Sequence, residues 1–178
     1  RPDDNHPPTS GDPPAQRGRG AGRAFGEPHP KAQDNFTDPD SRIMKTSAGF
    51  EQCYNGQTAV DAHAQIIVAA ELTNCAADHG ELTRMLDVVT ATLGGAPAVA
   101  LADAGYRSEA ELAQLSDSAT EVLVALGREG KGQGAIDADR LPYTAAMAAK
   151  LQTAEGRAKY RRRKVIVEPP NGWLKQVL

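Results

Sequence analysis

The fold of this chain is decided by the run Val99-Ala100-Leu101-Ala102-Asp103, a short apolar stretch that lies between Pro97 and Gly105. An apolar run of this length between Pro and Gly is typical of a buried central strand. Sheets of that kind bind ligands at the carboxyl ends of their strands, and Asp103 stands at such an end. The spacing alone favours the simpler alternative, a helix N-cap or turn residue. Asp103 is the first candidate functional residue, as a metal ligand held rigidly at a strand end.

Periodicity on either side of this run predicts a mixed α/β fold with helices packed on the sheet. Upstream, it predicts two strands of an antiparallel hairpin and one helix, over residues 54–61, 65–73 and 79–93. Downstream, it predicts a capped short helix, a strand, a loop and then helices, beginning near residues 108, 121, 127 and 142. Pro169 and Pro170 fit best in a first helical turn, so we expect the last helix to restart near Glu168.

Length and composition limit the class of protein. The chain has 178 residues, of which 40% are hydrophobic and 4% aromatic, so it suits one domain with a core of small aliphatic side chains. No apolar run approaches the roughly 18 residues of a membrane span. The two cysteines, Cys53 and Cys75, cannot form a disulfide framework or a four-cysteine zinc site. The N-terminus has no secretion signal, so we expect a cytoplasmic protein with no membrane partner. Because residue 1 is Arg, we also expect a piece of a longer protein.

Charge divides the chain into three parts. Residues 1–34 are neutral in sum, residues 35–149 carry a net charge of −9, and residues 150–178 carry +6. The basic end indicates contact with a polyanion such as nucleic acid, although a basic tail on an acidic domain is the simpler alternative. Residues 1–34 also hold seven of the twelve prolines. We expect this Pro/Gly/Arg-rich segment to be disordered and residues 35–178 to form the domain.

Glu168 is the second candidate carboxylate. It closely follows the basic run from Arg157 to Lys164, and on a helix Lys164, Glu168 and Lys175 would lie within about 40° of one another. An ordinary ion pair between residues i and i+4 is one explanation. The other is phosphodiester chemistry, in which converging carboxylates bind two divalent metal ions and nearby cations hold the DNA backbone.

Four motifs in order resemble the DDE transposases of bacterial insertion sequences, most closely the IS1182-like branch of the IS4-type group. They occupy residues 35–44, 54–61, 101–106 and 160–169, and the resemblance extends to the last residue. It implies a ribonuclease-H-like fold and an active site in which two aspartates and a glutamate bind Mg²⁺ or Mn²⁺. By this resemblance, Asp103 matches the second aspartate of the family and Glu168 matches its glutamate. The resemblance implies that each of the two residues is catalytic and binds the metal.

The chain departs from the family pattern in two places. The first aspartate usually precedes a Gly-Thr or Ser-Thr pair, and residues 1–34 contain no such motif. We therefore expect an incomplete ribonuclease-H-like mixed sheet without its first strand, with low stability or association into a homo-oligomer. The signature Tyr-x2-Arg-x3-Glu-x6-Lys is met in part, because Lys175 is in place, Lys164 stands where Arg is usual, and Tyr160 is one residue early.

The resemblance implies a set of DNA contacts: Arg161, Arg162, Arg163, Lys164 and Lys175. Trp173 is expected to pack in the core, with stacking on a nucleic-acid base as the minority alternative. Three functions stay open. The first is the catalytic core of a transposase that acts on insertion-element DNA, here as a C-terminal piece that is inactive alone. The second is a non-catalytic DNA-binding remnant. The third, a different ribonuclease-H-like nuclease or a resolvase, is disfavoured by the motif at residues 35–42.

Overall fold

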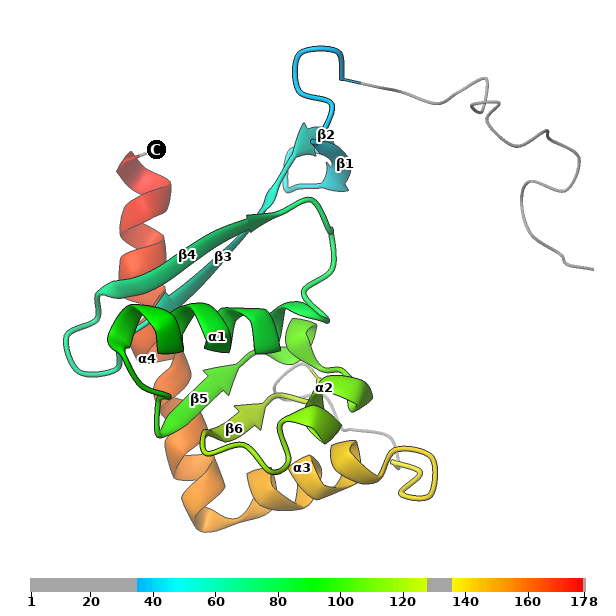
Figure 1. Ribbon diagram of the computed structural model, residues 1–178, viewed down its shortest axis with the longest axis vertical. Helices are drawn as coiled ribbons and strands as arrows, with labels where there is room; N and C mark the ends of the chain where they lie inside the picture. Colours follow the sequence, from blue (N-terminus) through cyan, green and yellow to red (C-terminus); the bar gives the residue numbers. More distant parts are fainter. Residues whose placement is uncertain (1–34, 128–135, 178) are drawn as a thin grey trace, which may run out of the picture.

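The computed structural model describes residues 35–127 and 136–177, which form a mixed α/β fold (Figure 1). Its strands pair into three two-stranded sheets, β1 with β2, β3 with β4, and β5 with β6. The predicted disordered segment 1–34 and most of the predicted loop 127–140 lie outside the described residues. None of the helices in the described ranges is long and apolar enough to cross a membrane.

The parallel pair β5 (Val99–Ala102) and β6 (Glu121–Val124) forms the centre of the core. Leu123 and Val124 of β6 are fully buried, and side chains from three helices pack around them, among them Leu82, Leu112 and Met147. Burial of this aliphatic cluster removes a large apolar area from water and stabilises the fold. The strand predicted from the run at residues 99–102 is therefore confirmed, but its predicted central and buried position is not, because β5 pairs only with β6 in the described residues and only Ala102 of it is buried.

The antiparallel hairpin of β3 (Asn55–Val60) and β4 (Ile67–Thr73) is also confirmed. Helix α1 (Glu81–Leu93) covers one face of it, where Met85 and Val89 pack against Ala69. The other face meets α4 (Ala154–Val177), which runs on the far side of the hairpin from α1 (Figure 1). Because side chains alternate along a strand, neighbouring residues of β3 contact different helices.

A second hairpin precedes the first and was not predicted. It consists of β1 (Arg42–Lys45) and β2 (Phe50–Cys53), joined by a turn in which Gly49 has φ of 139°. Only Met44 of its residues is in the buried core. Such short, largely exposed strands show no clear hydrophobic alternation, so the sequence pattern of this region gives no strand signal.

The short helix α2 (Glu109–Gln114) caps two other helices. Glu111 accepts hydrogen bonds from the backbone nitrogens of Gly80 and Thr83 at 2.7 and 3.0 Å, at the start of α1. Glu109 accepts from the backbone nitrogens of Tyr143 and Thr144, at the start of α3 (Pro142–Gln152). Each carboxylate satisfies donors that a helix leaves unpaired. Ser108 caps α2 as predicted, but Glu111 contacts α1 and does not complete the predicted capping box.

Helix α4 runs without a break from Ala154 to Val177, so the predicted restart near Glu168 is wrong. Pro169 has no N–H, and its place in the helix leaves the carbonyl of Val165 without its usual donor. The side chain of Gln65, in the turn between β3 and β4, donates to this carbonyl at 2.8 Å. The hairpin thus supplies a hydrogen bond that Pro169 removes, which explains how the helix accommodates this proline.

Candidate functional site

Asp103 lies at the carboxyl end of β5 and is the N-cap of the 3-10 turn η1 (Ala104–Tyr106). Its Oδ1 accepts a hydrogen bond from the backbone nitrogen of Gly105 at 2.8 Å. Helix α4 passes beside this strand end: the hydroxyl of its Tyr160 donates a hydrogen bond to the carbonyl of Ala102 at 3.1 Å. The position is therefore both a strand end and a cap, and the carboxylate is held in a defined orientation.

A second aspartate, Asp78, faces Asp103 across Gly105. A side chain at Gly105 would collide with Asp78 Oδ2, and its Cβ would lie 3.1 Å from Asp103 Oδ1. Both carboxylates therefore come within a few ångströms of one point, and only glycine leaves room for that approach. This places two hard oxygen donors together at the end of β5.

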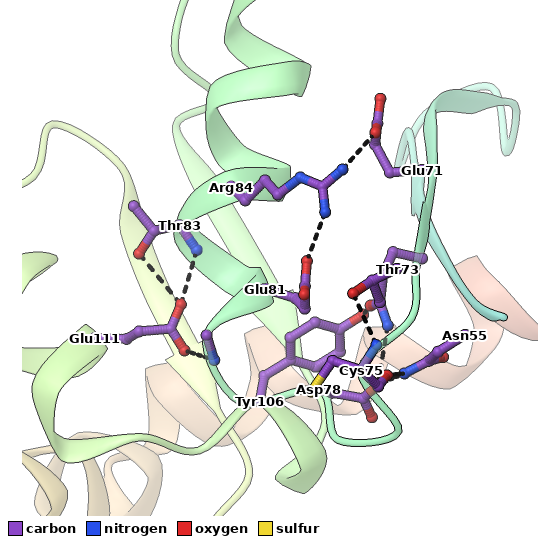
Figure 2. A network of polar contacts seen from close by, with 12 residues as sticks. Asn55, Glu71, Thr73, Cys75, Asp78, Glu81, Thr83, Arg84, Tyr106 and Glu111 are labelled. Carbon is purple, nitrogen blue, oxygen red and sulfur yellow. Dashed lines mark hydrogen bonds and ion pairs between the residues drawn. The ribbon is translucent and has the colours of Figure 1, made fainter. Parts of the chain in front are cut away.

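Two amide side chains from β3 hold Asp78. Asn55 Nδ2 and Gln57 Nε2 donate to Asp78 Oδ1 at 2.8 and 2.9 Å. Gln57 is 2% exposed and also accepts a hydrogen bond from the Tyr106 hydroxyl. Figure 2 shows Asn55, Asp78 and Tyr106 gathered between the hairpin, the loop before α1 and η1. The network links β3 to the end of β5, although the two strands do not pair.

The electrostatic environment of this network is anionic. Burial, followed by the charges of Asp78, Asp103 and Glu81, raises the pKa of Tyr106 to about 12. The phenol therefore stays protonated at neutral pH and donates to Gln57. Negative charge concentrated at a strand end favours a cation there.

Glu168 lies on α4 and not on the strand end or loops that carry Asp103 and Asp78. It is exposed on α4, two turns and thus about 12 Å along the helix axis beyond Tyr160. One turn further, Asn171 lies 3.4 Å from the Thr58 hydroxyl of β3. In the ranges 35–127 and 136–177, no group of three or more His, Cys, Asp or Glu side chains could hold a metal ion. Asp78 and Asp103 are brought together, and Glu168 does not join them in such a group.

The basic residues of α4 divide by helical face. An outward stripe, called the cationic stripe below, consists of Arg157, Arg161, Lys164, Glu168 and Lys175, all exposed. Arg162 is exposed on a different side. Arg163 is partly buried, with its guanidinium 5.7 Å from the centre of the Tyr160 ring. Its Nε is buried without a hydrogen-bond partner in the described part of the chain. Four of the five predicted DNA contacts thus face solvent, and Arg163 is turned towards the domain.

Trp173 is 64% exposed, so the predicted core packing is wrong. The reason is geometric: this part of α4 meets the hairpin through Asn171, 3.4 Å from the Thr58 hydroxyl, and Trp173 lies about 160° away from Asn171 around the helix. Only Gly156 and Ile166 of α4 are buried. The helix therefore has no continuous buried apolar stripe, and its sequence pattern does not show which face is covered.

Asp78 is a site residue that the sequence pattern does not single out, because an aspartate just before a helix ordinarily serves the helix start. One signal was present. Asn55 and Gln57 alternate on the same face of β3 as Ala59, which packs against α1. A buried amide such as that of Gln57 requires a hydrogen-bond partner, and the half-buried Asp78 is that partner.

Comparison with known proteins identifies the family. Residues 26–178 match the family model of the transposase DDE domain, and the chain therefore belongs to this family. The family generally uses a divalent metal and acts in DNA transposition. No curated protein and no solved structure matches the chain.

The residues present fit a divalent metal only in part. Carboxylate oxygens such as those of Asp78 and Asp103 are the ligands that Mg²⁺ takes. A pair of carboxylates is nevertheless short of the several ligands that a two-metal site needs, and the described residues offer no third acid beside them.

Proposed function

We propose that this chain serves DNA transposition as the part of a DDE transposase catalytic domain, of the IS1182-like type, that carries Asp103 and Glu168. In a complete site these two carboxylates would bind Mg²⁺ or Mn²⁺ for DNA cleavage and strand transfer. The observation that carries the proposal is the contact of Tyr160 with Ala102. It anchors the helix that bears the cationic stripe directly beside the strand that ends in Asp103.

Each group has a distinct part in this proposal. The exposed cations Arg161, Arg162, Lys164 and Lys175 hold phosphates and set the position of the DNA. The backbone of Gly105 orients Asp103, and the Asn55–Gln57–Asp78 network fixes the turn that contains Gly105. Arg163 acts through Tyr160 and supports the contact between α4 and β5.

We further propose that the chain does not cleave DNA alone. Too few carboxylates converge at the end of β5 to bind a divalent cation firmly. Without a firmly bound cation, the charge repulsion between the carboxylates is not compensated. A non-catalytic DNA-binding remnant is the second candidate function. Within the described residues no three acids form a group that could hold a metal ion. DNA binding by the cationic stripe needs no such group, so a binding function is compatible with this arrangement.

A salt titration tests the DNA contact. Binding of a labelled duplex should weaken with salt, because bound cations of the protein displace counterions from the phosphates. The variant Arg161→Ala/Lys164→Ala should reduce the slope of log affinity against log salt by about one for each phosphate that it leaves unneutralised. Arg140→Ala, an exposed cation outside α4, is the matched control and should leave the slope unchanged. Equal slopes for all three proteins would reject the stripe as the contact.

Plasmid nicking with Mg²⁺ or Mn²⁺ tests the chemistry. We expect no nicking by the chain alone. Nicking that Asp103→Asn or Glu168→Gln abolishes would show that the two carboxylates act without a further ligand and would contradict the proposed inactivity. Nicking that persists in both variants would reject their assignment.

A further inference from the structure

Helix α4 exposes a second line of residues beside the cationic stripe. Val165, Pro169 and Trp173 follow at intervals of four and are all exposed, Val165 by 69% and Trp173 by 64%. Residues at this spacing lie along one side of a helix. Arg162, at the beginning of this apolar line, is exposed as well. The apolar line is about a third of a turn from the cationic stripe and spans about 12 Å of the helix axis.

The charge beside this line indicates the occupant. The cationic stripe has four positive residues and one negative residue, and residues 150–178 carry a net charge of +6. A partner that covers both lines must therefore combine negative charge with flat apolar surface. Single-stranded DNA has this combination, because its backbone is charged and the faces of its bases are free to stack. In a duplex the bases are already stacked on one another, so a duplex can use the cationic stripe alone.

We propose that α4 binds single-stranded DNA, with the backbone along the cationic stripe and a base stacked on Trp173. This inference rests on the proposed function for the identity of the nucleic acid as DNA. The apolar line has room for about three bases at a spacing of roughly 3.4 Å. Trp173 is the stacking platform, and Arg162 is placed to hold a phosphate at the other end of the line.

The fluorescence of Trp173 tests this inference directly, because it is the only tryptophan of the chain. A short oligothymidylate should quench this fluorescence as it binds. A labelled duplex of the same length should bind, as measured by anisotropy, without quenching. Trp173→Ala should weaken single-strand binding about tenfold and leave duplex binding unchanged, whereas Trp173→Phe should keep most of the affinity. Phe36→Ala removes an exposed aromatic residue outside α4 and should change neither result.

The outcomes separate this inference from the proposed function. Suppose that both DNAs bind, that neither quenches the tryptophan fluorescence, and that Trp173→Ala does not change the affinity for either. This result would overturn the inference and leave the proposed function standing. Binding of neither DNA would overturn both. A change in tryptophan fluorescence with protein concentration in the absence of DNA would show that a second copy covers the apolar line, and would overturn the inference.

Discussion

At the scale of single residues, the approach of Asp78 and Asp103 depends on the absence of a side chain at Gly105. The backbone of Gly105 is not in the left-handed region, so its role is to provide space and not a special conformation. Asp78 cannot withdraw freely, because Asn55 and Gln57 hold its other oxygen. Asp78 is thus held between the two amides of β3 and the backbone of Gly105.

We expect Gly105→Ala to destabilise the fold by about 1–3 kcal/mol, because the added methyl group would force the network around Asp78 to move. Urea unfolding measures the change. Gly95→Ala is the matched control, since a Cβ there meets no atom within 4 Å, and it should be close to neutral. An equal effect of both substitutions would contradict the role assigned to Gly105.

The Tyr106 phenol makes the stability of the fold depend on pH. Its pKa in the folded state is about 12, above the ordinary value of 10.0. The protonated form is therefore favoured by folding, so this contribution to stability is fully present below pH 10 and is lost as the pH rises towards 12. We expect the urea midpoint to fall in this range and Tyr106→Phe to remove part of the fall. A fall of the same size in Tyr106→Phe would exclude Tyr106 as its source.

At the scale of elements, α4 owes its continuity at Pro169 to the hairpin turn. We expect Gln65→Ala to cost about 1 kcal/mol, because the carbonyl of Val165 loses its donor. In a Pro169→Ala background the residue at 169 regains its N–H and can donate to the same carbonyl. Gln65→Ala should then be nearly neutral. A double-mutant cycle by urea unfolding measures the coupling, and additive effects would show that the two residues do not share this acceptor.

At the scale of the whole molecule, β3 and β5 each have only one paired neighbour in the described residues. Unpaired strand edges are templates for association. We expect the chain to form oligomers as its concentration rises, measured by sedimentation velocity. A monomer with a sharp thermal transition across the same concentrations would show that these edges are not available for pairing.

The sequence predicted those parts of the fold that local pattern determines. The run at residues 99–102, the hairpin of β3 and β4 and the end of α1 at Leu93 each follow from neighbouring residues. The passage of α4 through Pro169 was not predictable, because it depends on Gln65, about a hundred positions away. Asp78 and the exposure of Trp173 were missed for the same reason, since both depend on which faces meet in three dimensions. The pairing of Asp103 with Glu168 stays a prediction.

The two carboxylates of α2 connect the stability of helices that are distant in sequence. Glu111 and Glu109 accept hydrogen bonds from backbone N–H groups at the starts of α1 and α3. Detachment of this six-residue segment would expose both turns at once. Hydrogen exchange at the amides of Gly80, Thr83, Tyr143 and Thr144 should consequently proceed at a common rate, as one cooperative opening unit.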